Sequence, residues 1–232
     1  MSLANRVAVI TGATGNLGRA TARVFAEQGA RLALIGTNAD RLQSLASELK
    51  LSSDRVLTHV VDLREPAGTR AAAQTIVEKF GRVDIVLHLV GGWSGGKTIA
   101  QVEASEFEAM LQQHLWTTVH LTQAFLPHLV ANRWGRIIAI SSPVATRPVE
   151  KSAPYAIAKA AQETLMLTLA HEVRGTGVTA NILQVRAIDS KREREPGTIA
   201  WTTPAEIVAA MFYLCSDEAE VVNGTRIPLS GV

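Results

Sequence analysis

Seven short apolar blocks recur along the chain, and longer stretches with apolar residues at helical spacing separate them. The blocks span residues 6–11, 31–36, 55–61, 84–90, 135–141, 177–185 and 225–229. Strands with so few polar residues are typical of a sheet covered on both faces, and a helix between successive strands makes the sheet parallel with right-handed crossovers. The pattern predicts an α/β fold: a doubly wound parallel sheet of about seven strands with helices on both faces.

Two of the helical stretches, residues 106–130 and 154–174, are apolar around more of their circumference than one sheet face can cover. A second apolar surface is therefore needed. We expect a homo-oligomer, either a dimer or a homotetramer.

The composition fits one globular domain that spans residues 1–232. With 47% apolar residues the chain can bury one sizeable core. Its 23 basic and 21 acidic residues are scattered, so no basic stripe predicts binding to nucleic acid or to a membrane. No apolar run reaches the roughly 18 residues of a membrane span and the first residues lack an export signal, so we expect a cytoplasmic protein. The single cysteine, Cys215, is expected to be a core thiol.

The stretch "VAVITGATGNLGRATARVFAEQG" combines a buried strand, a glycine-rich turn and an amphipathic helix. Gly12, Gly15 and Gly18 allow close approach of the backbone to a ligand, and the amides at a helix N-terminus favour an anion. In this setting the turn predicts a dinucleotide site. The alternative is a turn with a structural role alone.

The end of the second strand bears on the choice of dinucleotide. An acid that binds the ribose hydroxyls is usual there, but the sequence has Gly36, Thr37 and Asn38. Thr37 and Asn38 can donate to a 2′-phosphate, whereas Asp40 is interpreted as a helix cap. The cofactor is predicted to be NAD(P), with a preference for NADP.

The segment "PYAIAK" places Tyr155 and Lys159 four residues apart, on one face of the helix that Pro154 begins. A neighbouring ammonium is expected to lower the pKa of a phenol. Tyr155 is therefore predicted to exchange a proton with a carbonyl or an alcohol. The alternative is a helix tyrosine with its ring in the core and its hydroxyl in water.

With the glycine turn, "YAIAK" and Ser142 thirteen residues before the tyrosine, the whole chain resembles the compact single-domain branch of the short-chain dehydrogenase/reductase family. The resemblance implies a Rossmann-type fold and an oxidoreductase that transfers a hydride between NAD(P) and a ketone or secondary alcohol. It implies Tyr155 as the acid/base, Lys159 as the residue that tunes it and holds the nicotinamide ribose, and Ser142 as the hydroxyl that polarises the substrate oxygen.

The resemblance also implies which residues bind the cofactor, with Asp62 against the adenine unless it only starts a turn. These residues are Gly12, Thr14, Gly15, Asn16, Leu17, Gly18, Thr37, Asn38, Asp62, Leu63, Val90, Gly91, Tyr155, Lys159, Ile188 and Ser190.

Several positions depart from the family pattern. Asn16 replaces the middle glycine of the turn, where its tolerance of a left-handed backbone would preserve phosphate binding. The usual "NNAG" is "HLVG" here, residues 88–91. His114 stands where the family has its active-site asparagine, so it is either a catalytic proton relay or a helix histidine with satisfied hydrogen bonds. No histidine has metal-ligand spacing, so no metal site is predicted.

The largest departure follows the sixth strand, where Val185 and Arg186 replace Pro-Gly and alter the floor of the pocket. The basic residues from Arg186 into the short lid after it either recruit an anionic substrate group or are solvated, and the acidic neighbours in the lid favour the second interpretation. Trp93 and Trp201 either wall the pocket or pack on the surface. These departures leave an alternative function open: a catalytically impaired dinucleotide-binding module that acts as a sensor or a structural subunit. Lyase or epimerase chemistry with the same cofactor fits a chain this short less well.

Overall fold

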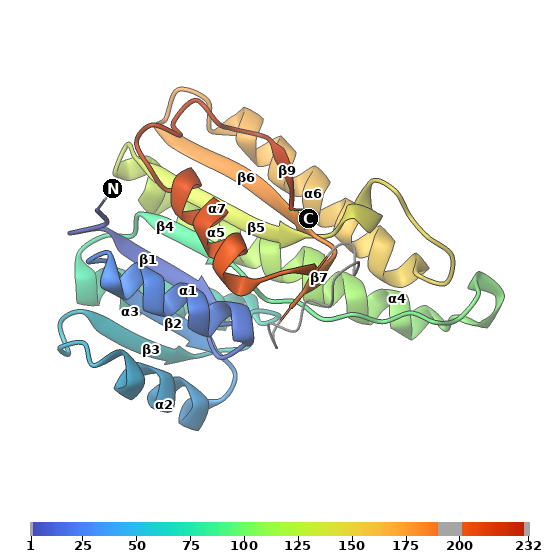
Figure 1. The fold of residues 1–232 in the computed structure, drawn as a ribbon, viewed down its shortest axis with the longest axis horizontal. Helices are drawn as coiled ribbons and strands as arrows, with labels where there is room; N and C mark the ends of the chain where they lie inside the picture. Colours follow the sequence, from blue (N-terminus) through green and yellow to red (C-terminus); the bar gives the residue numbers. More distant parts are fainter. Residues whose placement is uncertain (1, 190–200, 230–232) are drawn as a thin grey trace.

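The sheet has seven parallel strands in the order β3-β2-β1-β4-β5-β6-β9 (Figure 1). The structure is a computed structural model that describes residues 2–189 and 201–229. The strands are β1 (Val7–Thr11), β2 (Arg31–Gly36), β3 (Val56–Val60), β4 (Ile85–His88), β5 (Gly135–Ser141), β6 (Val178–Val185) and β9 (Arg226–Leu229). Each strand lies within its apolar block, so the predicted doubly wound α/β fold is confirmed.

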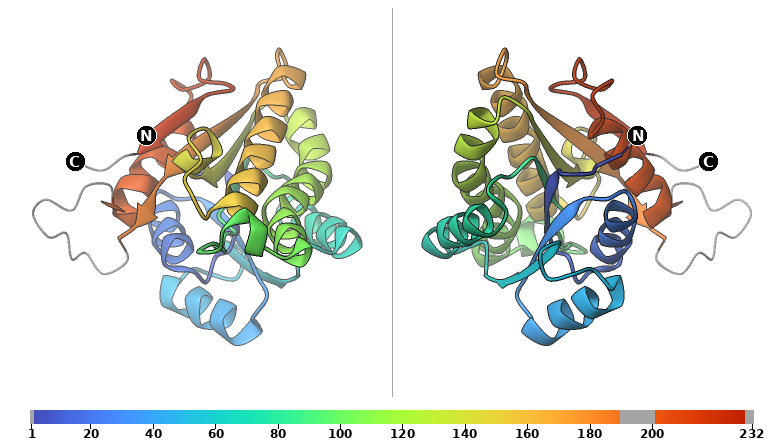
Figure 2. Two further views of the ribbon diagram at one scale, coloured as in Figure 1. Left: turned by 90° about the vertical axis from the view of Figure 1, so that its right-hand side faces the viewer. Right: turned by 90° about the vertical axis from the view of Figure 1, so that its left-hand side faces the viewer.

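Helices cover both faces of the sheet (Figure 2). One face carries α1 (Asn16–Glu27), α2 (Ala39–Leu49) and α7 (Pro204–Leu214), and the other carries α3 (Pro66–Phe80), α5 (Thr117–Ala131) and α6 (Ala153–Glu172). Within β1, Ile10 packs with the first set and Val9 with the second, and both are fully buried. Successive residues of a strand point to opposite faces, which explains why the strands have almost no polar positions.

The stretch predicted as one helix over residues 106–130 is divided. Helix α4 (Ala104–Leu111) leads into a π-helical turn, η2 (Gln112–Trp116), and then into α5. In this turn the Thr117 amide donates to the Gln112 carbonyl five residues back, instead of four. The π turn therefore changes the angular spacing of the side chains here, including that of His114.

Shorter elements lie near the carboxyl edge of the sheet. They are the 3₁₀ turns η1 (Ile99–Gln101) and η3 (Pro143–Ala145), and the paired two-residue strands β7 (Ala187–Ile188) and β8 (Trp201–Thr202). The sequence pattern did not predict β7 and β8, because two residues are too few to show a period.

The cysteine, the exposed apolar side chains and the character of the helices bear on three further expectations from the sequence. Cys215 is buried at the end of α7, and burial raises the pKa of its thiol to about 12, so the core thiol is confirmed. Trp116, Val130 and Ile157 are exposed on η2, α5 and α6, although the oligomer itself stays a prediction. Among the described residues, no helix combines the length and the apolar character that crossing a membrane requires.

Candidate active site

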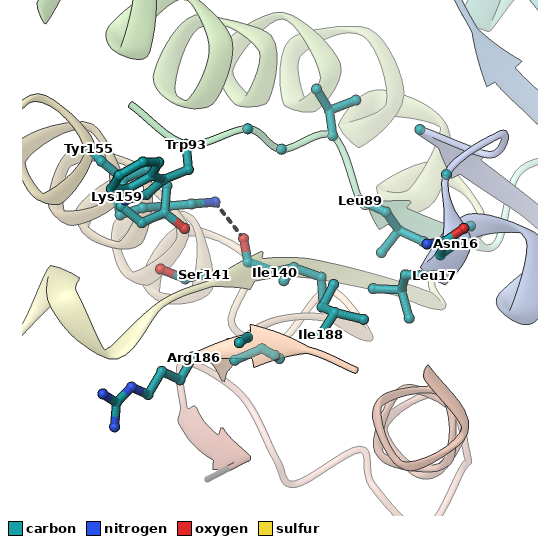
Figure 3. Close-up of a pocket in the computed structure, with 18 residues that line it drawn as sticks. Asn16, Leu17, Leu89, Trp93, Ile140, Ser141, Tyr155, Lys159, Arg186 and Ile188 are labelled. Atoms are coloured by element: carbon teal, nitrogen blue, oxygen red, sulfur yellow. Dashed lines mark hydrogen bonds between the residues drawn. The ribbon is translucent and has the colours of Figure 1, made fainter. Parts of the chain in front are cut away.

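A cleft runs along the carboxyl ends of the central strands (Figure 3). It consists of two adjoining cavities of about 430 and 520 Å³. Both are lined by the glycine turn after β1 and by residues 89–91 after β4. Strands β1 and β4 are neighbours at the point where the strand order reverses, which is where open α/β sheets bind their ligands.

The glycine turn has the shape that the sequence predicted, for a partly different reason. Gly12 has a φ of +63°, and a Cβ on Gly18 would lie 2.3 Å from the Gly12 carbonyl oxygen. Both positions therefore require glycine. Asn16 is instead the first residue of α1 and does not have a positive φ, so the expectation of a left-handed asparagine is wrong. The N-cap residue of α1 is Gly15, which has no side chain to cap the helix, and Leu17 lines the cavity beside it.

The side chains that follow β2 differ in part from the roles that the sequence predicted for them. Thr37 lines the larger cavity, as expected. The Asn38 side-chain oxygen accepts a hydrogen bond from the Arg41 amide at 2.9 Å and thereby caps α2, so Asp40 is not the cap. Asn38 lines neither cavity of the cleft, unlike Thr37. Arg41 lines the cavity, and its guanidinium donates to the Thr14 carbonyl at 2.8 Å.

Arg41 was missed by the sequence reasoning. A signal for it was present, because a cation in the first turn of a helix opposes the helix dipole and calls for another explanation.

Asp62 and Leu63 line the same cavity after β3. The Arg64 side chain binds both Asp62 oxygens, and this hydrogen bonding holds the pKa of the Asp62 carboxyl below its usual range. The Leu63 carbonyl accepts from His120 Nδ1 at 2.9 Å. This segment is therefore fixed in place at the wall where the resemblance expects adenine.

Val90 and Gly91 line both cavities, and His88 is the last residue of β4, just before this loop. The His88 ring is buried between Thr11 Oγ1, 3.1 Å from Nδ1, and Thr117 Oγ1, 3.2 Å from Nε2. Burial lowers the pKa of His88 to about 3. The imidazole that replaces an amide of the family motif is thus a neutral ring with both nitrogens hydrogen-bonded.

Tyr155 and Lys159 both line the smaller cavity, on the side away from Asn16 (Figure 3). Burial raises the pKa of Tyr155 above its usual value, and a hydrogen bond with the buried Ser142 partly offsets this effect. Lys159 Nζ lies 5.9 Å from the centre of the Tyr155 ring. The expected lowering of the phenol pKa is therefore wrong for this structure, because burial is the largest effect on Tyr155 and raises its pKa.

Lys159 is buried and held by two acceptors, the Ile140 carbonyl at 2.8 Å and Gln162 Oε1 at 2.9 Å. The Gln162 amide donates in turn to Thr118 Oγ1 at 3.0 Å. Burial lowers the pKa of Lys159 to about 7, against the opposing effect of Glu163. Gln162 was also missed, because a lone glutamine inside a helix carries no sequence signal.

His114 lies in the π turn, with its ring edge to face with Tyr155 at 5.4 Å between centres. Its Nε2 donates to the Gly92 carbonyl at 3.0 Å, while buried Nδ1 has no hydrogen-bond partner among the described residues. Burial lowers the pKa of His114 to about 3, so the ring is neutral at pH 7. The adjacent Gln113 donates to the Gly91 carbonyl at 2.8 Å, so the π turn anchors this loop.

The opposite wall of the smaller cavity is formed by Val185, Arg186 and Ile188, where the family has Pro-Gly. Trp93 also lines this cavity, whereas Trp201 lines neither cavity of the cleft. Ser190 and the lid after it lie outside the described residues. Ser141, which the sequence analysis passed over, adds a buried hydroxyl without a hydrogen-bond partner in the described chain.

The structure thus brings together most of the residues implied by the resemblance. Within residues 2–189 and 201–229, no three His, Cys, Asp or Glu side chains are grouped so as to hold a metal ion.

Comparison with known proteins gives consistent matches over the whole chain. A family model described as short chain dehydrogenase matches residues 6–197. The 3-oxoacyl-acyl-carrier-protein reductase FabG of Escherichia coli is 28% identical, covering 100% of this chain and 98% of the relative. The dehydrogenase subunit BbsD of Thauera aromatica is also 28% identical, covering 100% of this chain and 97% of the relative.

Solved structures of similar proteins have the same fold as this chain. The structure of L-sorbose reductase from Gluconobacter frateurii, complexed with NADPH and L-sorbose, has a TM-score of 0.89 at 27% identity and covers 100% of this chain and 97% of that one. An NADPH-bound short chain oxidoreductase from Pseudomonas aeruginosa has a TM-score of 0.91 at 24% identity, covering 99% of this chain and 97% of that one, which supports the fold.

Proposed function

The chain belongs to the short-chain dehydrogenase family and is an NAD(P)-dependent enzyme, and we propose that it transfers a hydride between the cofactor and a ketone or secondary alcohol. One observation carries the proposal. A single cleft holds the glycine turn at one end and Tyr155 with Lys159 at the other. We also propose that residues 1–232 form one domain that both binds the cofactor and carries out the reaction.

The residues in the cleft fit a dinucleotide. The turn is so tight that a Cβ on Gly18 would strike the Gly12 carbonyl, and α1 lacks a side-chain cap at the same place, so its amides suit a pyrophosphate. At the other end, Ser141 has a buried hydroxyl with no hydrogen-bond partner in the described chain, which suits a polar group of a ligand. When bound, the cofactor supplies or accepts the hydride.

In the proposed mechanism, the chain handles the proton and the developing charge. Tyr155 donates its proton to the substrate oxygen during reduction and accepts it during oxidation. The Ser142 hydroxyl, already hydrogen-bonded to Tyr155, stabilises the negative charge on that oxygen. Lys159, while protonated, stabilises the phenolate that Tyr155 leaves. His114 positions Tyr155 by its edge-to-face contact and anchors the Gly92 carbonyl.

The test is steady-state turnover of a panel of ketones with NADPH, compared with Tyr155→Phe. The variant is expected to lose about 10²- to 10⁴-fold in kcat. Its cofactor affinity, measured by titration of nicotinamide fluorescence, provides the readout of an intact site. Full activity of Tyr155→Phe would exclude the acid/base role. Cofactor binding by the wild type without turnover of any ketone or alcohol would point to the sensor or structural-subunit alternative.

We propose NADP as the preferred cofactor. Arg41 and Thr37 line the cavity next to the end of β2, where a carboxylate would be needed for NAD. Arg41→Gln should lower the ratio of kcat/KM for NADPH to that for NADH by roughly 10- to 100-fold, because a charge-assisted hydrogen bond is lost. Equal use of both cofactors by the wild type would contradict the preference.

We propose a homo-oligomer formed through the outer sides of η2, α5 and α6. The exposed Trp116, Val130 and Ile157 lie on these elements. Ile157→Glu should shift the mass measured by light scattering toward the monomer, because it places a charge in the interface. A wild type that is monomeric at high concentration would refute the assembly.

A further inference from the structure

Arg186 brings a positive charge to the mouth of the cavity that contains Tyr155. It follows β6 directly, its side chain is exposed and it lines the smaller cavity. Among the described residues, Arg186 and the buried Lys159 are the charged side chains of that lining, and no described Asp or Glu belongs to it. The nearby Glu163 is buried and engaged by Gln184 and Arg226. The cavity is therefore electropositive at the end where the proton is exchanged.

The guanidinium of Arg186 is available for a ligand. Within residues 2–189 and 201–229 it forms no hydrogen bond or ion pair, in contrast to Arg41 and Arg64, which are held by Thr14 and Asp62. Solvent-exposed arginines are common, so its position in the cavity wall is what makes this one informative.

The direction of the side chain separates it from the phosphate-binding turn. In Figure 3 the Arg186 guanidinium extends to the side of the view that holds Ser141 and Tyr155, whereas Asn16 and Leu17 lie at the opposite side. The cation and the turn that suits the pyrophosphate therefore lie at opposite sides of the cavity. The cation stands at the substrate end of the cleft.

Trp93 supplies an apolar surface at the same end. Its side chain is 66% exposed and lines the cavity. The loop that carries it is fixed, because the Gly92 carbonyl accepts from His114 and the Gly96 amide donates to the Lys151 carbonyl at 2.8 Å. A positioned aromatic ring and a free guanidinium together suit a substrate with an apolar body and an anionic group.

We propose that Arg186 binds an anionic group of the substrate, so that the enzyme acts on ketones or secondary alcohols that also carry a carboxylate or a phosphate. The planar fork of an arginine presents paired donors that match either group. This inference rests on the proposed function. It assigns to Arg186 the substrate selectivity of the site.

The test uses three probes with one body: para-acetylbenzoate, para-acetylphenyl phosphate and the neutral para-acetylbenzamide. For the wild type with NADPH, kcat/KM for an anionic probe should exceed that for the amide, and added salt should reduce the difference. Arg186→Gln should lower this ratio by roughly 10- to 100-fold. Arg186→Lys should retain part of it. Arg174→Gln removes an exposed charge outside the cavity lining and is the matched control, for which the ratio should not change.

The two anionic arms decide whether the carboxylate or the phosphate is preferred. Calorimetric binding of each probe to the NADP⁺ complex, which has no hydride to give to a ketone, provides the same comparison without turnover. The inference is overturned if the ratio of anionic to neutral probe is the same in the wild type and Arg186→Gln. Failure of the proposed function would look different: no carbonyl probe, charged or neutral, would be reduced.

Discussion

Gln162→Leu removes one of the two acceptors that hold the buried Lys159 ammonium. The remaining acceptor is the Ile140 carbonyl. Gln162 is 1% exposed, and its donation to Thr118 fixes the amide so that Oε1 faces Nζ. Leucine is close to glutamine in volume, so the change removes the acceptor without opening a large cavity.

The magnitude follows from the environment of Lys159, whose pKa burial already lowers to about 7. A hydrogen bond to a charged group contributes about 1.5–3 kcal/mol, and about 1.4 kcal/mol corresponds to one pH unit. Loss of the acceptor destabilises the protonated form more than the neutral amine, whose hydrogen bonds are weaker. The pKa of Lys159 should therefore fall further, to about 5–6.

The assay is the pH dependence of kcat/KM for ketone reduction. In the proposed mechanism reduction needs the protonated Lys159, so the rate falls as the pH rises through its pKa. The midpoint of this fall should lie near pH 7 in the wild type, and about one to two pH units lower in Gln162→Leu. Gln162→Glu supplies a charged acceptor and should move the midpoint to higher pH.

Gln43→Leu, the same change at an exposed position of α2, is the control and should leave the midpoint in place. The reasoning is refuted if leucine and glutamate at position 162 move the midpoint in the same direction, or if neither moves it.

Three further predictions concern other parts of the site. Gly18→Ala should destabilise the fold by about 1–3 kcal/mol in urea unfolding and weaken cofactor binding, because its Cβ would lie 2.3 Å from the Gly12 carbonyl; Gly91→Ala, which meets nothing within 4 Å, should leave stability unchanged. Ser142→Ala should reduce kcat by about 10²- to 10³-fold while the protein stays folded by circular dichroism, and an unchanged kcat would argue against the stabilising hydroxyl. His114 has its pKa lowered to about 3, so its contribution to stability is fully present above the unfolded pKa of about 6.5 and is lost as the pH falls toward 3. Between pH 7 and pH 5, His114→Asn should lose about 2 kcal/mol less unfolding free energy than the wild type, and equal losses would contradict the buried neutral ring.

The order of strands and helices could be predicted because it depends on local patterns. Each strand is a run of apolar residues that only a sheet covered on both faces can bury, and the glycine turn has a shape that only Gly12 and Gly18 permit. The spacing of Tyr155 and Lys159 likewise follows from the pitch of one helix.

The protonation behaviour of the site could not be predicted, because it depends on how distant segments pack. Burial by surrounding elements reverses the expected direction of the pKa of Tyr155 and lowers that of Lys159. The hydrogen bond between Lys159 and Gln162 could not be predicted either, because the Gln162 side chain is fixed by Thr118 of a different helix.

The sequence by itself determined the doubly wound sheet, the turn that suits a pyrophosphate and the tyrosine–lysine pair, since hydrophobic period, glycine geometry and helical pitch act within a few residues. Only the tertiary structure decided that Arg41 and Arg186 stand at opposite ends of the cleft, that His114 is neutral beside Tyr155, and that Asn38 caps a helix. These outcomes depend on distances and solvent exclusion between segments far apart in the chain, which hydrophobic patterning does not encode.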